Sequence, residues 1–75
     1  MKLHEVIKAI RLEMGLPQQA LARELHVCFA MVNRWENQRS KPTKIAIHAL
    51  AELAMSRKVA KELIKQLKEL EFQDK

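Results

Sequence analysis

Residues 18–36 read QQALARELHVCFAMVNRWE, and this stretch decides the fold. Its pattern predicts two short helices joined by a tight turn at His26-Val27-Cys28, with the second helix over about Phe29–Asn37. The turn must hold the two helices at a fixed angle. The apolar residues expected to fix this angle are Leu21, Leu25, Val27, Val32 and Trp35. The small side chain of Ala22 is expected to let the two helices approach closely.

Upstream of this stretch, residues 3–14 predict an amphipathic helix. Gly15 is expected to end it, and Pro17 is expected to open the next helix at its first helical position, where the fixed φ of proline is tolerated. The apolar residues at three- and four-residue spacing in the first helix are Leu3, Val6, Ile7, Ile10 and Met14.

Downstream, residues 38–42 form the clearest loop in the chain, and Thr43 is expected to cap a fourth helix that runs through Met55. A buried stripe is predicted along this helix at Ile47, Leu50, Ala51 and Ala54.

Ser56 is expected to cap a fifth helix from Arg57 to about Phe72. Its seam, Ala60, Leu63, Leu67 and Leu70, resembles a two-heptad coiled-coil face. Such a seam can complete the core, form a homodimer or dock another protein, and core completion with some dimerisation is favoured. Because the joint has neither glycine nor proline, one bent helix in place of the fourth and fifth is an alternative.

The whole chain of 75 residues supports one domain with a single core. Its 48% apolar residues argue against intrinsic disorder. With one glycine, two prolines and few β-branched residues, it predicts an all-α, compact five-helix domain over residues 1–75.

The net charge of +5 suits a polyanionic partner, although many basic domains bind nothing charged. Its distribution is more informative, because residues 15–44 carry five basic residues against Glu24 and Glu36. The five are Arg23, Arg34, Arg39, Lys41 and Lys44.

The single cysteine, Cys28, excludes an intramolecular disulfide, and charged residues interrupt every apolar segment. We therefore expect a cytoplasmic protein with no membrane association.

The quoted stretch, together with Arg11, Gly15-Leu16 and the sequence WENQRSKP at 35–42, resembles the helix-turn-helix of the Cro and phage-repressor family, also called the XRE family. The resemblance covers most of residues 6–54 and implies sequence-specific binding of double-stranded DNA. It also implies transcriptional regulation, more often repression than activation.

The family presents side chains to base edges at the positions of Phe29, Ala30, Asn33 and Arg34. Asn33 suits adenine, Arg34 suits guanine or a phosphate, and Phe29 and Ala30 suit thymine methyl groups. The alternative is that Asn33 and Arg34 are only solvated and that Phe29 is partly buried. Phosphate contacts are expected, partly from the family and partly from charge and position, at Gln18, Gln19, Asn37, Arg39, Lys41 and Lys44.

The family also implies a bridge between Arg11 and Glu36 that holds the recognition helix, and it favours Trp35 as a core residue over a stacking platform. Three positions depart from the family pattern. Pro17 stands where a Ser or Thr commonly caps the second helix, and Cys28 stands where a Ser or Thr would cap the third. His26 replaces the glycine of the turn between them. A helix N-terminus can lower the pKa of a thiol, so redox control through Cys28 is one reading, and a small apolar filler is the more common one.

Other functional classes fit less well. The histidines are dispersed and no phosphate-binding glycine loop is present, which argues against an enzyme and against a cofactor. His26 and Cys28 alone are a weak zinc signal, so no metal is expected. The main alternative is a protein-interaction module of the same fold, such as an antitoxin that binds a toxin or a partner-binding adaptor.

Overall fold

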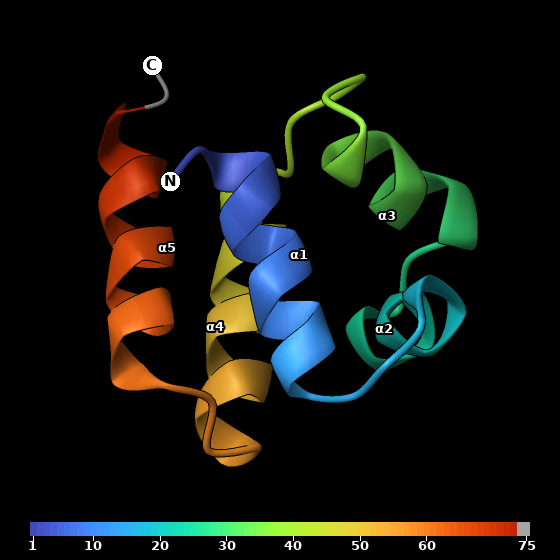
Figure 1. Ribbon diagram of the computed structural model, residues 1–75. Helices are drawn as coiled ribbons and strands as arrows, with labels where there is room; N and C mark the ends of the chain where they lie inside the picture. The colour runs from blue at the N-terminus through green and yellow to red at the C-terminus, as the bar shows by residue number, and fades with distance from the viewer. Residues whose placement is uncertain (74–75) are drawn as a thin grey trace.

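A computed structural model describes the backbone of residues 1–73 and the side chains of residues 1–70. It is all-α within these residues, as the sequence predicts. Figure 1 shows α1, α4 and α5 lying side by side, with α2 and α3 on the other side of α1. The five helices are α1 (Leu3–Glu13), α2 (Gln18–Leu25), α3 (Phe29–Glu36), α4 (Lys44–Ser56) and α5 (Lys61–Gln73).

The first helix begins and ends as its sequence predicts. At its start, the Lys2 backbone N–H donates a 2.8 Å hydrogen bond to Glu5 Oε1, and this bond holds the pKa of the Glu5 carboxyl below its ordinary value. At its end, Gly15 takes a left-handed conformation with φ of 71°, which glycine adopts without steric cost. The chain therefore turns sharply from α1 toward α2.

Pro17 differs from its predicted position. It lies just before α2 in an extended conformation with ψ of 166°, so it is the N-cap and not the first helical residue. Its carbonyl accepts the first helical hydrogen bond, from the Leu21 N–H at 3.0 Å. No side chain caps this end of the helix, as expected for proline in place of Ser or Thr.

The fourth helix starts as predicted, because Thr43 Oγ1 accepts a 3.1 Å hydrogen bond from the Ala46 N–H. The cap predicted at Ser56 for the following helix was wrong. Ser56 is the last residue of α4 and caps nothing downstream; its Oγ donates to the Leu53 carbonyl at 2.8 Å. Lys58 then takes a left-handed φ of 60°, which breaks the helix without a glycine. Hence α4 and α5 are separate helices.

The fifth helix begins at Lys61 and not at Arg57, and the seam predicted along it is shifted. Leu67 is fully buried, and Leu63 and Leu70 pack against the core in part, but Ala60 is exposed. Ile64 and Val59, which were not predicted, are buried. The seam thus completes the core of the monomer, as favoured.

The core lies where the helices meet. Each fully buried Leu or Ile contributes about 1.5–3 kcal/mol relative to an exposed side chain. The largest fully buried side chains are Val6, Ile7, Ile10, Leu21, Val32, Leu50 and Leu67. Among the described residues, no helix combines the length and the apolar character that crossing a membrane requires.

Candidate nucleic-acid interface

The turn between α2 and α3 sets the angle of α3. His26 takes a left-handed conformation, with φ of 59° and ψ of 39°, as its glycine-like position predicts. The Val27 N–H then donates to the Ala22 carbonyl at 3.0 Å. Ala22 is 2% exposed, so its small side chain lies at the close approach of the two helices. These contacts fix α3 against α2.

Arg11 and Glu36 form the bridge that the resemblance implies. Arg11 Nε lies 2.6 Å from Glu36 Oε2, and Arg11 Nη2 lies 3.0 Å from Glu36 Oε1. Arg11 Nη1 also donates to the Leu16 carbonyl at 3.0 Å. The two side chains are only 10% and 4% exposed. A bidentate, nearly buried ion pair therefore ties α1 to the end of α3.

Gln18 extends this bridge to the outer part of α3. Its Nε2 donates to Glu36 Oε1 at 3.1 Å, and its Oε1 accepts from Asn33 Nδ2 at 3.1 Å. Arg11, Glu36, Gln18 and Asn33 thus form one continuous hydrogen-bonded network, hereafter the bridging network. The family resemblance implies that Gln18 braces the recognition helix, but Asn33 was not predicted as its partner, because no local pattern relates two polar residues fifteen positions apart.

The four predicted base-reading residues lie on α3 at positions that share one face. Phe29 is 47% exposed, and Ala30 and Arg34 are also exposed. Asn33 is half-buried, and its amide bonds to Gln18. The apolar residues on the opposite face, Val32 and Trp35, are buried, so the Trp35 ring belongs to the core.

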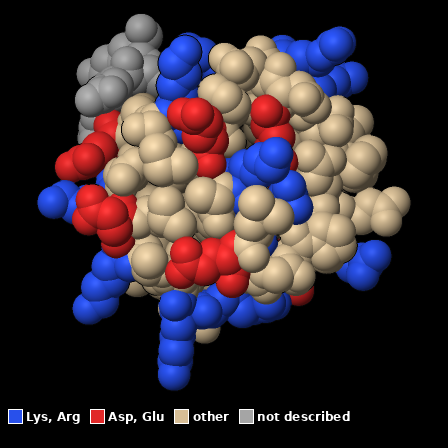
Figure 2. All heavy atoms as spheres, in the orientation of Figure 1, with Lys and Arg blue, Asp and Glu red and all other residues tan. Residues whose placement is uncertain are grey.

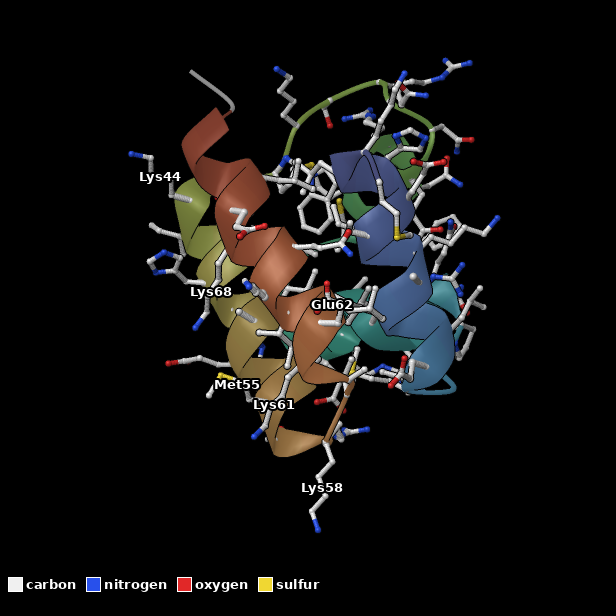
Figure 3. All side chains as sticks on the ribbon, turned by 60° about the vertical axis from the view of Figure 1, so that its left-hand side comes forward. Lys44, Met55, Lys58, Lys61, Glu62 and Lys68 are labelled. Atoms are coloured by element: carbon white, nitrogen blue, oxygen red, sulfur yellow. The ribbon has the colours of Figure 1, made fainter. Side chains whose placement is uncertain are left out.

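The predicted phosphate-contacting residues are less uniformly placed. Gln19, Asn37, Arg39 and Lys41 are exposed at the start of α2 or after α3. Asn37 Nδ2 donates to the Asn33 carbonyl at 2.8 Å. Figure 2 shows basic side chains projecting at the upper right, where Figure 1 draws α3 and the loop after it. Lys44 projects from the start of α4 on the side of Lys68, away from that loop (Figure 3).

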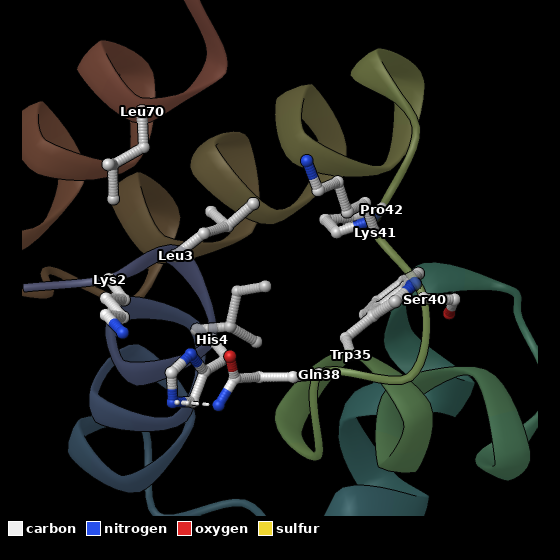
Figure 4. Close-up of a pocket in the computed structure, with 10 residues that line it drawn as sticks. Lys2, Leu3, His4, Trp35, Gln38, Ser40, Lys41, Pro42 and Leu70 are labelled. Atoms are coloured by element: carbon white, nitrogen blue, oxygen red, sulfur yellow. Dashed lines mark hydrogen bonds between the residues drawn. The ribbon is translucent and has the colours of Figure 1, made fainter. Parts of the chain in front are cut away.

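A cavity of about 250 Å³ lies behind the loop after α3. Figure 4 shows it between the start of α1, the indole of Trp35 and Leu70. Gln38 Nε2 lies 3.3 Å from His4 Nε2 at its edge, so the loop is tied to α1. Trp35 Nε1 and Ser40 Oγ have no hydrogen-bond partner in the described part of the chain.

Cys28 is an exposed free thiol directly before α3 and makes no side-chain cap. The described residues contain no group of three or more His, Cys, Asp or Glu side chains that could hold a metal ion. The arrangement is thus an exposed helix face with basic flanks on a rigid support.

Comparison with known proteins agrees with this arrangement. A model of a helix-turn-helix family matches residues 7–54, which is more than half of the chain and extends from α1 to α4. No curated protein and no solved structure matches the chain.

Proposed function

Because the chain belongs to the XRE family of Cro- and repressor-type helix-turn-helix DNA-binding regulators, we propose that it reads a specific double-stranded DNA sequence with α3 in the major groove. The observation that carries this proposal is the exposed face of α3, held in place by the bridging network. An α-helix fits the major groove of double-stranded DNA, where each base pair presents a distinct pattern of hydrogen-bond donors and acceptors.

The chemistry of each exposed side chain suggests its target. The Arg34 guanidinium can donate two parallel hydrogen bonds to guanine, and Phe29 and Ala30 can contact thymine methyl groups. Asn33 donates one N–H to Gln18, and its second N–H and its carbonyl oxygen are the groups that adenine requires. We assign Asn33 both a supporting and a reading role.

Phosphate contacts position the helix without reading sequence. The proposed contacts lie on both sides of α3. Gln18 and Gln19 are at the start of α2, and Asn37, Arg39 and Lys41 are in the loop after α3. Lys44 stays a prediction, since it projects to another side. Binding that depends on these residues must weaken as salt rises, because cations condensed on DNA are released on binding.

We further propose that the protein acts as a repressor. We also propose that it works in a reducing cytoplasm, which agrees with the free thiol of Cys28. A homodimer through the C-terminal helix also stays a prediction. The leucines that suggested it are used by the core of the monomer, with Leu67 fully buried. Sedimentation at tens of micromolar tests it, because a strict monomer would exclude a stable dimer.

The proposal is tested by selecting bound duplexes from a random pool with the full chain. A short consensus is expected to emerge, and Arg34→Ala is expected to relax it at one base position. If repeated rounds of selection yield duplexes with no shared sequence, the protein does not read bases and the proposal fails.

A further inference from the structure

A second surface, separate from α3, lies where the end of α4 meets the first half of α5. It is a groove of about 860 Å³ and is hereafter the lysine groove. Figure 3 shows Met55, Lys61 and Lys68 on this side of the molecule, with Lys58 below them at the joint. The groove is lined by Met55, Lys58, Val59, Ala60, Lys61, Ile64, Lys65, Lys68 and Glu69.

The floor of the lysine groove is apolar. Val59 and Ile64 are 5% and 7% exposed, so the floor is continuous with the core, whereas Met55 is 56% exposed at the edge. An exposed methionine is flexible and polarisable and adapts to varied apolar partners. A surface of this kind favours burial of apolar side chains from a partner.

The walls of the lysine groove are fixed in place. The Ala60 N–H donates to Glu13 Oε1 at 2.8 Å, which ties the start of α5 to α1. Arg57 pairs with Glu24 at 3.2 Å and ties the same joint to α2. The backbone that shapes the groove is therefore held in place in the free chain, and a partner orders only the side chains of the rim on binding.

The rim of the lysine groove is strongly basic. Lys61, Lys65 and Lys68 follow one another at four- and three-residue spacing, so they project from one face of α5. Lys58 adds a fourth charge, and Glu69 is the one carboxylate among the lining residues. Glu62 lies on the other side of α5 (Figure 3). The excess of three positive charges surrounds the apolar floor and selects for acidic groups.

This charge pattern decides between possible occupants. In a two-fold homodimer through the groove, each chain presents the same patch, so eight lysines would be brought together. Like charges placed opposite one another at an interface cost several kcal/mol. An amphipathic helix with an apolar stripe and acidic flanks satisfies both the floor and the rim, since lysine stems can also cover apolar surface.

We propose that the lysine groove docks an acidic amphipathic helix of another protein. In Figure 1, α5 and α3 lie on opposite sides of the molecule. The partner can therefore bind while α3 is on DNA, and the chain can connect a DNA site to an acidic protein.

The test uses the biotinylated full chain as bait for yeast-displayed helical peptides of about five turns. One stripe of the peptides is apolar, and the flanking positions vary equally among Glu, Gln and Lys. The enriched peptides are expected to carry Glu at the flanks. The double variant Lys61→Glu, Lys65→Glu is expected to weaken their binding about tenfold or more, whereas Lys8→Glu, on exposed α1 surface, is expected to leave it within about twofold.

The apolar part of the surface has its own matched pair of variants on α4. Met55→Gln is expected to weaken the selected peptides several-fold, whereas Ile45→Gln, which is 83% exposed outside the lysine groove, is expected to leave them unchanged. Equal effects of the two would place the peptides elsewhere and contradict the proposal.

Four further outcomes would overturn it. Selection could yield no binder, or binders with no excess of Glu. Vesicles of anionic phosphatidylglycerol could bind through the same lysines in place of peptides, which would indicate a membrane surface. The Lys61→Glu, Lys65→Glu variant could lose duplex binding, which would make the groove part of the DNA interface. Simultaneous binding of a selected peptide and a duplex supports the proposal.

Discussion

Asn33 Nδ2 donates a 3.1 Å hydrogen bond to Gln18 Oε1 and so joins the proposed DNA-reading face of α3 to the first residue of α2. Through Gln18 the same contact continues to Glu36 and Arg11. The reading face and the buried ion pair are therefore parts of one network. Changes far from the DNA surface should alter recognition through it.

Removal of Glu36 tests this network. Glu36→Ala leaves the Arg11 guanidinium nearly buried without its carboxylate, which should lower the free energy of unfolding by about 3–5 kcal/mol. Urea denaturation measures this loss. The matched control is Glu24→Ala, because the Glu24–Arg57 pair is about 40% exposed and should contribute no more than about 1 kcal/mol. Equal losses in the two variants would show that the bridge does not support the fold.

The two polar readers should act on different base positions. Asn33→Ala and Arg34→Ala should each lower discrimination at one position by about 1–3 kcal/mol, since each removes a bidentate contact. Kd values for the consensus and for its single-base variants measure this. Uniform weakening across all duplexes would indicate that these residues contact phosphates.

Gln18→Ala tests whether the bond from Gln18 orients Asn33 for contact with a base. The variant removes the partner of Asn33 and a proposed phosphate contact but no proposed base contact. Binding should therefore weaken on all duplexes alike, and in addition preference should relax at the same base position as in Asn33→Ala, and by less. The same panel of duplexes measures the effect. Relaxation at a different position would show that Gln18 does not orient Asn33.

Arg39 should contribute charge without sequence preference. Arg39→Ala should weaken binding to consensus and scrambled duplexes alike and reduce the slope of log K against log salt by about one. Lys44→Ala should change the slope less, because Lys44 projects away from the loop after α3. If Lys44→Ala reduced the slope more than Arg39→Ala, the DNA phosphates would lie closer to the start of α4 than to the loop after α3.

The turn at His26 should gain stability from glycine. His26→Gly relieves a left-handed conformation and should raise the free energy of unfolding by about 0.5–1 kcal/mol. Lys8→Gly, within α1, should lower it by about 1 kcal/mol. Thermal unfolding measures both, and a loss on His26→Gly would mean that the imidazole makes a stabilising contact that outweighs the strain.

The helix-turn-helix and the start of α4 were predictable because their signals are local. The apolar spacing from Leu21 to Trp35 and the cap at Thr43 depend on residues within a few positions of one another. The start of α5 was not predictable from the sequence. The left-handed conformation of Lys58, just after α4, separates the two helices, and no glycine marks it. Ile64, which was not predicted to lie in the core, is buried, whereas Leu63 packs against the core only in part.

The candidate site shows the same limit. The sequence pattern predicted Phe29, Ala30 and Arg34 on one helix face, which α3 presents outward. The pattern did not predict that Asn33 bonds to Gln18, because this contact depends on the distance between two helices. Nor did it predict the lysine groove, which exists only once α5 packs against α4.

The most direct test of sequence-specific DNA recognition is the ratio of two Kd values, measured with the wild-type chain at physiological salt. One duplex carries the selected consensus and the other carries the same bases in scrambled order. We predict that the consensus binds at least about a thousandfold more tightly. Equal Kd values for the two duplexes would contradict the assignment of α3 as a base-reading helix.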